Sequence, residues 1–289
     1  MKLSTLQHQA RARVGILIGD DYVLLDNSQF KDMVDFVTLS LEDIEALAAA
    51  SVERVRASEA VLLAPIGRFG RDVLCTGWNY WDHFDEGVGK RDGQEVERPV
   101  APTFFTKAPN AITGPFDDIP IDDTISKKWD YEGEIAVVIG RQGRSISPEC
   151  AHEHIFGYML ANDVSQRDLQ RRHGGQWLKG KSIDRSSPTG PYIVTADEIT
   201  FDDIEIQTFV NDEQRQSAST RQMAFALPEL IAELSFGMTL YPGDVILTGT
   251  PSGIGMAMTP PRFLAAGDHI RVVAKGLGEL SNRCVATAR

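Results

Sequence analysis

The sequence predicts a mixed, β-rich α+β fold: a sandwich or roll of strands with a few helices. Short runs rich in β-branched residues recur along most of the 289 residues, and glycine and proline separate them. Strand and helix patterns do not alternate regularly, which disfavours a doubly wound parallel sheet. Hydrophobic residues make up 42% and charged residues 24% of the chain, the balance of a globular protein with a substantial core.

The first 68 residues are expected to form a small α+β domain. The runs RVGILIG and YVLLD, separated by two aspartates, predict a hairpin-like pair of strands. A helix is expected in SLEDIEALAAASVERVRAS, because Ser40 and Asp43 resemble a capping box. Apolar residues then recur at helical spacing as far as Val55, so the helix is expected to extend that far.

Residues 69–289 are expected to form a second, catalytic domain, because proline and glycine in VLLAPIGRFG punctuate the chain there. Helical stretches are expected near residues 148–156 and 225–239. The expected strands are DVLCTGWN, PTFFTK, EGEIAVVIG, PYIVT, DIEIQTFVN, DVILTGT and HIRVVAKG. Residues 85–99 are charged, rich in glycine and poor in apolar side chains, which predicts a mobile loop of the kind that serves as a lid.

Charge and hydropathy exclude several classes of protein. The net charge of −12 argues against a nucleic-acid binder that neutralises phosphates. The N-terminal residues lack the apolar core and cleavage site of a secretory signal, and the longest apolar runs fall short of the ~18–20 residues that span a bilayer. The three cysteines are too few and too far apart for a zinc or redox pair or for an even disulfide framework. We therefore expect a soluble, cytoplasmic protein with reduced thiols and with neither nucleic acid nor membrane as a partner.

The stretch WDYEGEIAVVIG places Asp130, Glu132 and Glu134 beside a block of branched apolar residues. On one strand these carboxylates would share a face and repel each other, which protonation, arginine partners or a bound cation would relieve. Oxygen-only ligands favour Mg²⁺, Mn²⁺ or Ca²⁺ over zinc. The alternative is a solvent-facing edge of a half-buried sheet, and this stretch alone leaves both interpretations open.

A third carboxylate, Asp163, ends an apolar run about thirty residues later, where a strand gives way to a loop. A turn or N-cap aspartate is the alternative. A basic island follows it, formed by Arg167, Gln170, Arg171, Arg172, His173, Lys179 and Lys181. Beside a carboxylate cluster such residues suit an anionic ligand that bridges metal and protein, whereas a solvated helix face would account for Arg171 and Arg172.

Two further features suggest a reaction site. In YPGDVILTGTPSGIG a strand runs into a glycine-rich loop whose backbone amides could cradle an anion, although a nucleotide P-loop is excluded by the missing GK[ST] ending. His83 precedes the expected lid and has Glu86 three residues later, so the carboxylate could hold the imidazole on a helical turn and raise its basicity. The alternative is an exposed histidine with an incidental glutamate.

Together these segments resemble the fumarylacetoacetate hydrolase superfamily over roughly residues 72–284. NYWDH with Glu86 is similar to the family's N-Y-x-D-H-x-x-E segment, and DYEGEIAVVIG is similar to its Y-E-x-E strand. The remaining similar segments follow in the family's order: FFTKAPNAITGP, ANDVSQRDLQ, GQWLKGKSIDRSSPTGP, VN with RQ, and LYPGDVILTGTPSGIG.

The resemblance implies a β-roll catalytic domain, a small N-terminal domain, a homodimer and a divalent cation, commonly Mg²⁺. By position, the metal ligands would be Glu132, Glu134 and Asp163. The family's fourth carboxylate ligand has no clear counterpart in this sequence.

The resemblance also implies catalytic and substrate-side positions. His83 and Glu86 would orient and activate water within a segment that closes as a lid, and Lys181 would face the developing negative charge of the substrate. The substrate-side positions are Arg167, Gln170 and Thr250.

The activity that the resemblance implies is hydrolysis of a carbon–carbon bond in a 2,4-dioxo acid of the acylpyruvate, fumarylpyruvate or diketo-deoxy sugar acid type. A metal-stabilised enolate would leave as a pyruvate-like product after attack of water, activated by His83, on the distal carbonyl. The alternative on the same fold is a decarboxylase or isomerase of 2-oxo diacids, in which His83 shuttles protons, or a ureidoglycolate-type lyase.

The sequence leaves the substrate open. GMAMTPPRFLAAGD is similar to members that act on deoxy sugar acids or ureidoglycolate, whereas Trp78, Trp81 and Phe84 favour an apolar or aromatic chain. A non-catalytic binding relative is disfavoured, because the expected carboxylate ligands and the His–Glu pair are all present.

Overall fold

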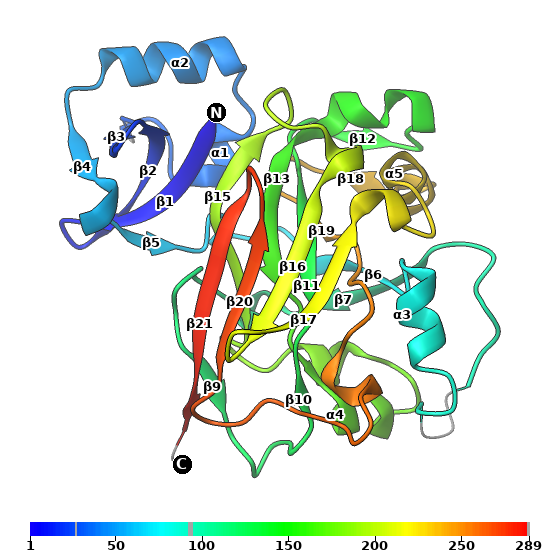
Figure 1. Cartoon of the computed structure of the whole chain (residues 1–289). Helices are drawn as coiled ribbons and strands as arrows, with labels where there is room; N and C mark the ends of the chain where they lie inside the picture. Colours follow the sequence, from blue (N-terminus) through cyan, green and yellow to red (C-terminus); the bar gives the residue numbers. More distant parts are fainter. Residues whose placement is uncertain (27, 92–94, 288–289) are drawn as a thin grey trace.

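A computed structural model describes residues 1–26, 28–91 and 95–287, shown in Figure 1 in the colours of the sequence. The strands of its larger sheet are β1 (Lys2–His8), β2 (Arg11–Ile18), β3 (Asp21–Leu24), β4 (Arg54–Arg56), β5 (Val61–Leu63), β6 (Val73–Gly77), β7 (Thr103–Lys107), β8 (Ile112–Thr113), β11 (Gly133–Ile139), β13 (Ile155–Asn162), β15 (Ser187–Thr195) and β19 (Val245–Leu247). They run in the order β4-β3-β2-β1-β15-β13-β11-β19-β6-β7, with β5 paired to β1 and β8 to β15.

A second sheet packs against the first. Its strands are β9 (Ile119–Ile121), β16 (Glu205–Val210), β17 (Glu213–Ser219), β20 (His269–Ala274) and β21 (Gly278–Ala286), in the order β17-β16-β20-β21-β9. Two short pairs complete the strand structure: β10 (Trp129–Asp130) with β14 (Ser165–Gln166), and β12 (Gly143–Arg144) with β18 (Thr239–Leu240). The predicted β-rich α+β fold is confirmed, and each of the expected strand segments contains a strand.

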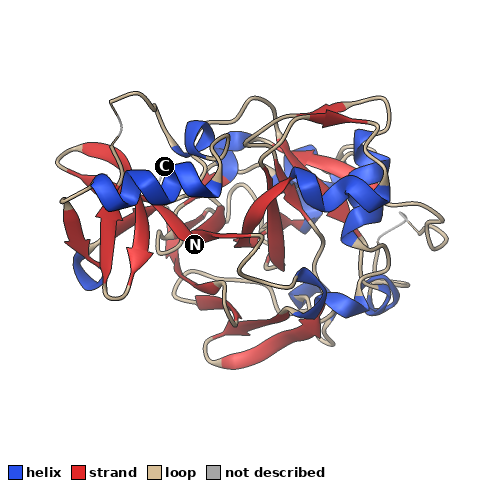
Figure 2. Ribbon diagram, turned by 90° about the horizontal axis from the view of Figure 1, so that it is seen from above, coloured by secondary structure: helices blue, strands red, loops and turns tan. Residues whose placement is uncertain are grey.

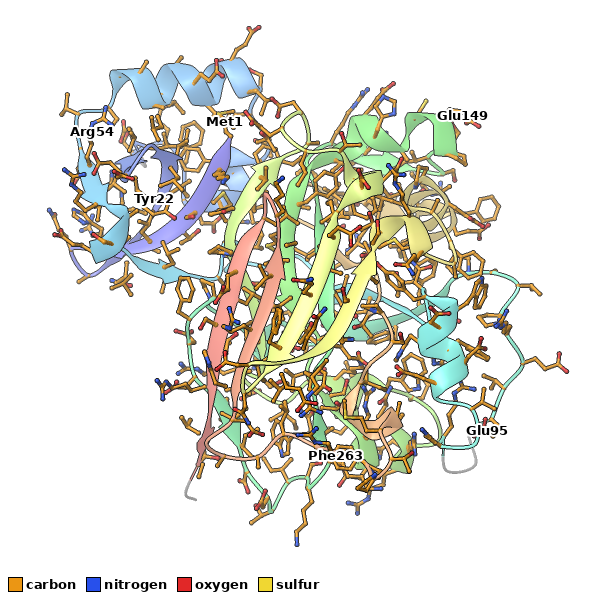
Figure 3. The ribbon with its side chains drawn as sticks, viewed as in Figure 1. Met1, Tyr22, Arg54, Glu95, Glu149 and Phe263 are labelled. Atoms are coloured by element: carbon orange, nitrogen blue, oxygen red, sulfur yellow. The ribbon has the colours of Figure 1, made fainter. Side chains whose placement is uncertain are left out.

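Burial patterns follow the position of each strand. Alternate residues of β16 and β20 are buried, as expected for strands with one face on a core. Every residue of β11 is buried, which matches its unbroken apolar run and its central place in the larger sheet. Side chains of both sheets, among them Val137, Leu160, Ile206 and Val272, form one hydrophobic cluster between them. Figure 3 shows the side chains of both sheets as sticks.

The α-helices are α1 (Met33–Phe36), α2 (Leu41–Ala50), α3 (Trp81–Glu86), α4 (Arg167–Arg172) and α5 (Leu227–Ser235). The 3-10 helices span Ala57–Glu59, Pro109–Ala111, Pro148–His154, Leu178–Lys181, Phe201–Asp203, Thr220–Gln222 and Gly255–Ala257. Figure 2, seen from above, shows helices arranged around an interior that is filled mainly by strands. The described residues include no helix that is both long and apolar enough to cross a membrane.

The start of α2 is as predicted, but its end is not. The Ser40 hydroxyl accepts a hydrogen bond from the Asp43 backbone N–H, 3.1 Å away, as an N-cap does. The helix stops at Ala50, and Val52 is 94% exposed. Val55 lies instead in β4, which pairs with β3. The expected extension of the helix to Val55 is therefore wrong, because pairing with β3 overrides the helical spacing of the apolar residues.

The two other expected helical stretches are present in shorter form. Residues near 148–156 form a 3-10 helix over Pro148–His154 rather than an α-helix. Residues near 225–239 form α5, with Pro228 in its first turn and Gly237, at φ +73°, two residues after its end.

The N-terminal strands join the larger sheet. The predicted hairpin is confirmed, because β2 and β3 pair antiparallel. β1 pairs with β2, with β5 and with β15, so it connects the N-terminal strands to the central ones. Leu3 and Phe36 share a hydrophobic cluster with Val73 and Val138. The division of the chain after residue 68 stays a prediction.

Candidate metal centre and active site

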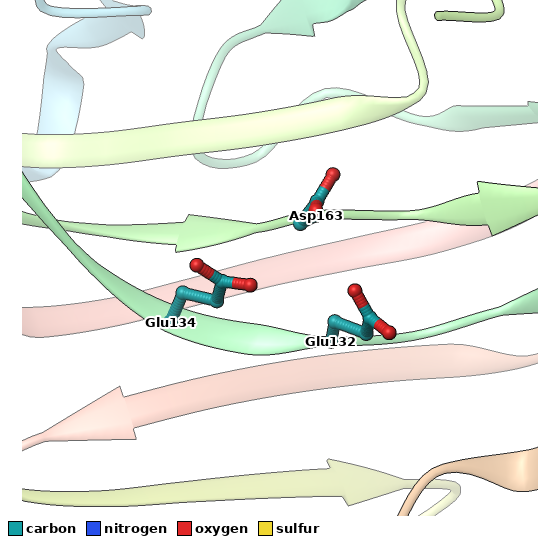
Figure 4. A group of neighbouring side chains, drawn as sticks. All are labelled: Glu132, Glu134 and Asp163. Carbon is teal, nitrogen blue, oxygen red and sulfur yellow. The ribbon is translucent and has the colours of Figure 1, made fainter. Parts of the chain in front are cut away.

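Three buried carboxylates meet where β11 begins and β13 ends. Glu132 directly precedes β11, Glu134 is its second residue, and Asp163 directly follows β13. β11 and β13 are antiparallel neighbours, and the Asp163 N–H donates to the Glu132 carbonyl oxygen over 2.8 Å. Ligand oxygens of the three side chains lie within 4.8 Å of one another. Figure 4 shows Glu132 and Glu134 on one segment and Asp163 on the segment beside it.

The interpretation of this stretch as a wet sheet edge is wrong, because Glu132 and Glu134 are only 4% and 3% exposed. The expectation that Asp130 shares a strand face with them is also wrong. Asp130 lies in β10, which is separate from β11, and its carboxylate accepts from Arg167 Nε at 3.0 Å. The chain changes course between the two strands, where the Glu132 N–H donates to the Asn162 side chain instead of a sheet partner.

Cationic side chains surround two of the three carboxylates. Lys181 Nζ donates to Glu132 and, over 2.7 Å, to Asp163 Oδ2. Arg167 Nη2 lies 2.7 Å from Glu132 Oε1, and Lys107 Nζ lies 2.8 Å from Asp163 Oδ1. Burial opposes ionisation of Glu132, but the charges of Arg167 and Lys181 hold the pKa of Glu132 well below its usual range. Burial opposes the charge of Lys181 as well, and the carboxylates of Asp163 and Glu132 raise the pKa of Lys181 above its ordinary value.

Glu134 is the exception within the cluster. Its Oε2 accepts from the Gly249 backbone N–H over 2.7 Å, and among the described residues it contacts no cationic side chain. Burial, and then the charges of Asp163 and Glu132, raise the pKa of Glu134 well above its usual range. A divalent cation would remove this conflict, and an all-oxygen donor set suits Mg²⁺, Mn²⁺ or Ca²⁺. The cluster therefore fits the cation that the sequence led us to expect.

The predicted His83–Glu86 contact is present on α3. His83 Nδ1 lies 2.8 Å from Glu86 Oε1, and Glu86 Oε2 accepts from the Gly253 N–H, also over 2.8 Å. The interpretation of His83 as an exposed residue is wrong, because it is buried and lines the same pocket as Glu132. A carboxylate can only accept, so the proton of the neutral imidazole is on Nδ1 and Nε2 is the nitrogen that can accept a proton.

The glycine-rich loop after β19 binds carboxylates of the protein itself. Its backbone donors and their acceptors are Gly249 to Glu134, Gly253 to Glu86, and Gly255 and Met256 to Asp130. Thr250 is held in the same loop, because its hydroxyl donates to the Gly133 carbonyl oxygen at 3.0 Å and accepts from Gln216 Nε2 at 2.8 Å. The sequence indicated an anion cradle here, and the anions are the side chains that build the site.

These groups line one pocket, which encloses about 60 Å³. Of the expected site residues, the pocket is lined by His83, Glu132, Glu134, Arg167, Gln170, Lys181 and Thr250. Glu86 and Asp163 do not line the pocket, but Glu86 contacts His83 and Asp163 accepts from Lys181, and both of these partners line it. In the basic island Arg171 also lines the pocket, so a solvated helix face does not account for it, whereas Arg172 is exposed.

Aromatic rings form another wall of this pocket. The Trp177 ring lies 4.8 Å from Trp78 and 5.0 Å from Phe105, between ring centroids. A Cβ atom at Gly77 would lie 2.5 Å from the Trp177 ring, so only glycine lets this wall close. Sequence reasoning did not single out Trp177, Lys107 or Arg91. The lysine of FFTK was the available signal for Lys107, which is fully buried.

The fold and this site define a family. The sequence model described as Fumarylacetoacetate (FAA) hydrolase C-terminal matches residues 72–285, and the chain belongs to this family. Oxaloacetate tautomerase YisK of Bacillus subtilis (strain 168) is 39% identical over 305 aligned residues, which cover 98% of this chain and 99% of that protein.

Solved structures give the same family and fold. The fumarylacetoacetate hydrolase (EaFAH) of the psychrophilic Exiguobacterium antarcticum is 39% identical, with a TM-score of 0.85 over 99% of this chain and 100% of that one. Maleylpyruvate hydrolase of Sphingobium sp. SYK-6, solved with manganese(II) and pyruvate, is 28% identical, with a TM-score of 0.79 over 100% of both chains. The resemblance seen in the sequence is confirmed. The relatives' names include both tautomerases and hydrolases.

Proposed function

We propose that this protein interconverts the keto and enol tautomers of a small 2-oxo diacid of the oxaloacetate type, with a divalent cation. The observation that carries the proposal is that the His83–Glu86 pair and the buried carboxylate cluster meet at one pocket of about 60 Å³. This pocket combines a proton acceptor with a site for a cation. The full-length similarity to an oxaloacetate tautomerase supports the choice of reaction.

The cation would be held by Glu132, Glu134 and Asp163, and Mg²⁺ is our first choice, ahead of Mn²⁺ and Ca²⁺. When bound, it would supply Lewis-acid polarisation of the keto oxygen. The manganese(II) in the maleylpyruvate hydrolase structure is consistent with such a cation. The homodimer and the cytoplasmic location expected from the sequence stay predictions, which light scattering and cell fractionation would test.

The side chains of the chain account for the proton transfer. His83 Nε2 would take a proton from the carbon next to the keto group and return it in the reverse direction. Glu86 holds Nδ1 and stabilises the imidazolium that forms. Lys181 uses two of its three N–H groups on Glu132 and Asp163, which leaves one to donate to the developing enolate oxygen.

The aromatic rings of the pocket wall would exclude water from the reacting atoms. The Lys181 ammonium lies 5.1 Å from the centre of the Phe105 ring, and Trp78 and Trp177 close the same side. Exclusion of water strengthens the interaction between the ammonium and the enolate oxygen. It also disfavours hydrolysis, which is consistent with a tautomerase.

The proposal is tested by exchange of the C3 protons of oxaloacetate in D₂O, followed by NMR. With Mg²⁺ or Mn²⁺ the protein should accelerate exchange over the same metal concentration alone, and removal of metal with a chelator should abolish the effect. His83→Gln should lower the rate by roughly 10²- to 10⁴-fold, the usual contribution of a general base. Exchange no faster than the metal-only control would refute the proposal.

Hydrolysis of 2,4-dioxo acids is the second candidate, because a His–Glu pair can also activate water. The names of two structural relatives favour it. The test is metal-dependent release of pyruvate from acylpyruvates in ¹⁸O-labelled water. Label in the carboxylic acid product would establish hydrolysis. Release of CO₂ from oxaloacetate, or of urea from ureidoglycolate, would instead indicate the decarboxylase or the lyase.

A further inference from the structure

Arg91 is a buried cation at the pocket that the mechanism above does not use. It follows α3, is 5% exposed, and lines the same pocket as His83 and Glu132. Its guanidinium lies 4.1 Å from the centre of the Phe84 ring, and its Nη2 donates to the Phe84 carbonyl oxygen. The side chain is therefore held in one orientation by stacking and by one hydrogen bond.

The other end of the guanidinium lacks a hydrogen bond. Arg91 Nη1 is buried and has no hydrogen-bond partner among the residues that the structure describes. Glu95 Oε2 lies 3.5 Å from it, but the Glu95 side chain is 46% exposed at the edge of the molecule, where Figure 3 labels it. A buried donor without a partner destabilises the folded protein, and native proteins rarely contain one unless a ligand or water satisfies it. The hydroxyl of Thr76, which also lines the pocket, is likewise buried without a partner in the described part of the chain.

Charge balance indicates what Arg91 would bind. The pocket cations Arg167 and Lys181 already contact buried carboxylates. Lys181 and the cation site are assigned above to the 2-oxo acid end of a substrate. Arg171 lines the pocket too, and its Nη2 lies 2.8 Å from the Met256 sulfur. A second carboxylate on the substrate needs a further cation, and a guanidinium with an unused donor suits a carboxylate.

We infer that Arg91 determines specificity by binding the distal carboxylate of a 2-oxo diacid in the pocket that also contains the cation site. This inference rests on the proposed function for the position of the 2-oxo acid group. It limits the preferred substrates to short diacids. It also predicts that the same pocket discriminates against 2-oxo acids with an apolar end.

The test compares oxaloacetate with 2-oxobutyrate, in which a methyl group replaces the distal carboxylate and whose C3 protons exchange through the same kind of enol. Arg91→Gln should lower kcat/KM for oxaloacetate by about 10- to 150-fold, the equivalent of about 1.5–3 kcal/mol for a charged hydrogen bond. Exchange of 2-oxobutyrate should change less than about 3-fold. Arg91→Lys should give an intermediate loss, because an ammonium keeps the charge and loses the planar fork.

Arg98→Gln is the matched control. Arg98 is 52% exposed, pairs with Asp85 and does not line the pocket. The exchange rates of both substrates should therefore be unchanged in Arg98→Gln. If Arg91→Gln lowered kcat/KM equally for oxaloacetate and for 2-oxobutyrate, Arg91 would only hold the segment after α3 in place. An unchanged kcat/KM for both substrates in Arg91→Gln would also overturn the inference. So would a selective loss of oxaloacetate exchange in Arg171→Gln instead of in Arg91→Gln.

A binding experiment separates this inference from the proposed function. Calorimetric titration of the Mg²⁺-loaded protein with malate and with 2-hydroxybutyrate needs no turnover. If the wild type exchanges neither 2-oxo acid, the proposed reaction fails. Tighter binding of malate that is lost in Arg91→Gln would still support Arg91 as the carboxylate site, and equal affinities in the wild type would refute it. If Arg91→Gln does not fold, as judged by its Tm, Arg91→Lys serves in both experiments.

Discussion

Gly253 donates its backbone N–H to Glu86 over 2.8 Å, and this contact joins the glycine-rich loop after β19 to the imidazole pair on α3. Gly253 has a φ of +109°, and a Cβ atom there would lie 1.9 Å from the Arg215 carbonyl oxygen. The position of the proposed proton acceptor therefore depends on a residue without a side chain, far from His83 in the sequence.

Gly253→Ala should lower both activity and stability. The methyl group forces the loop away from Arg215, which removes the N–H from Glu86 and loosens His83. We expect kcat to fall at least about 10-fold, because general-base catalysis depends on this orientation. Gly267→Ala is the control: its φ is +99° but nothing lies within 4 Å of its Cβ position, so it carries the backbone strain alone. Equal effects of the two substitutions on kcat would contradict the prediction.

The sequence predicted contacts within one segment of this site better than contacts between distant segments. The strands around Glu134 and the turn that holds His83 to Glu86 follow from side-chain alternation and from i, i+3 spacing, which are local properties. The loop amides were expected to bind an anion, but the anions are Glu134, Glu86 and Asp130, from distant segments. Pairing between distant segments depends on the tertiary fold, which residue spacing does not encode.

Two other differences have the same cause. Asp130 was grouped with Glu132 by alternation, yet pairing of β10 with β14 directs Asp130 to Arg167. The helix expected as far as Val55 ends earlier, because β4 pairs with β3. The choice between hydrolase and tautomerase has another cause: both reactions use the same His–Glu pair, so residue identity alone cannot separate them.

Stability should fall in alkali because of Tyr158. This side chain is buried beside Phe201, with ring centroids 5.2 Å apart, and burial raises the pKa of Tyr158 from 10.0 to about 12. Between these values the unfolded chain has lost the phenol proton and the folded chain keeps it. The contribution of Tyr158 to the free energy of unfolding is therefore constant below pH 10 and falls by about 1.4 kcal/mol per pH unit between pH 10 and about pH 12.

Tyr158→Phe should reduce this slope, as measured by urea unfolding between pH 9 and about pH 12. Tyr241→Phe is the control, because Tyr241 is 47% exposed. Other buried tyrosines contribute as well, so the comparison is the difference in slope between the variants. An unchanged slope in Tyr158→Phe would show that its phenol does not contribute.

Lys107 should be required for the fold more than for metal affinity. It is fully buried, lies 2.8 Å from Asp163 Oδ1, and donates to the Val164 carbonyl oxygen over 3.2 Å and to Ser187. Lys107→Met keeps much of the volume and removes the charge. The free energy of unfolding of the metal-free protein should fall by about 3–5 kcal/mol, the cost of breaking a buried ion pair.

The loss in Lys107→Met should be smaller with saturating Mn²⁺, because a cation at the cluster compensates the charge of Asp163. Urea unfolding with and without metal measures both values. Lys179→Met, at an exposed position nearby, controls for loss of a lysine charge in general. If Mn²⁺ did not change the loss of unfolding free energy in Lys107→Met, the loss would come from the hydrogen bonds to Val164 and Ser187 rather than from the ion pair with Asp163.

Glu132 and Glu134 should respond in opposite ways to loss of charge in the metal-free protein. Glu132→Gln breaks buried ion pairs with both Lys181 and Arg167, so the free energy of unfolding should fall by about 3–5 kcal/mol. Glu134→Gln replaces a buried carboxyl group, whose charged form has only a backbone N–H as partner, with a neutral amide, so the free energy of unfolding should stay level or rise. Both variants should lose the increase in Tm that Mn²⁺ gives the wild type, because each lacks a proposed ligand. The opposite result would be that Glu134→Gln destabilises the metal-free protein as much as Glu132→Gln does. The charge of Glu134 would then be compensated by the protein before metal binds. In that case Glu134 would not be the carboxylate that most needs the cation.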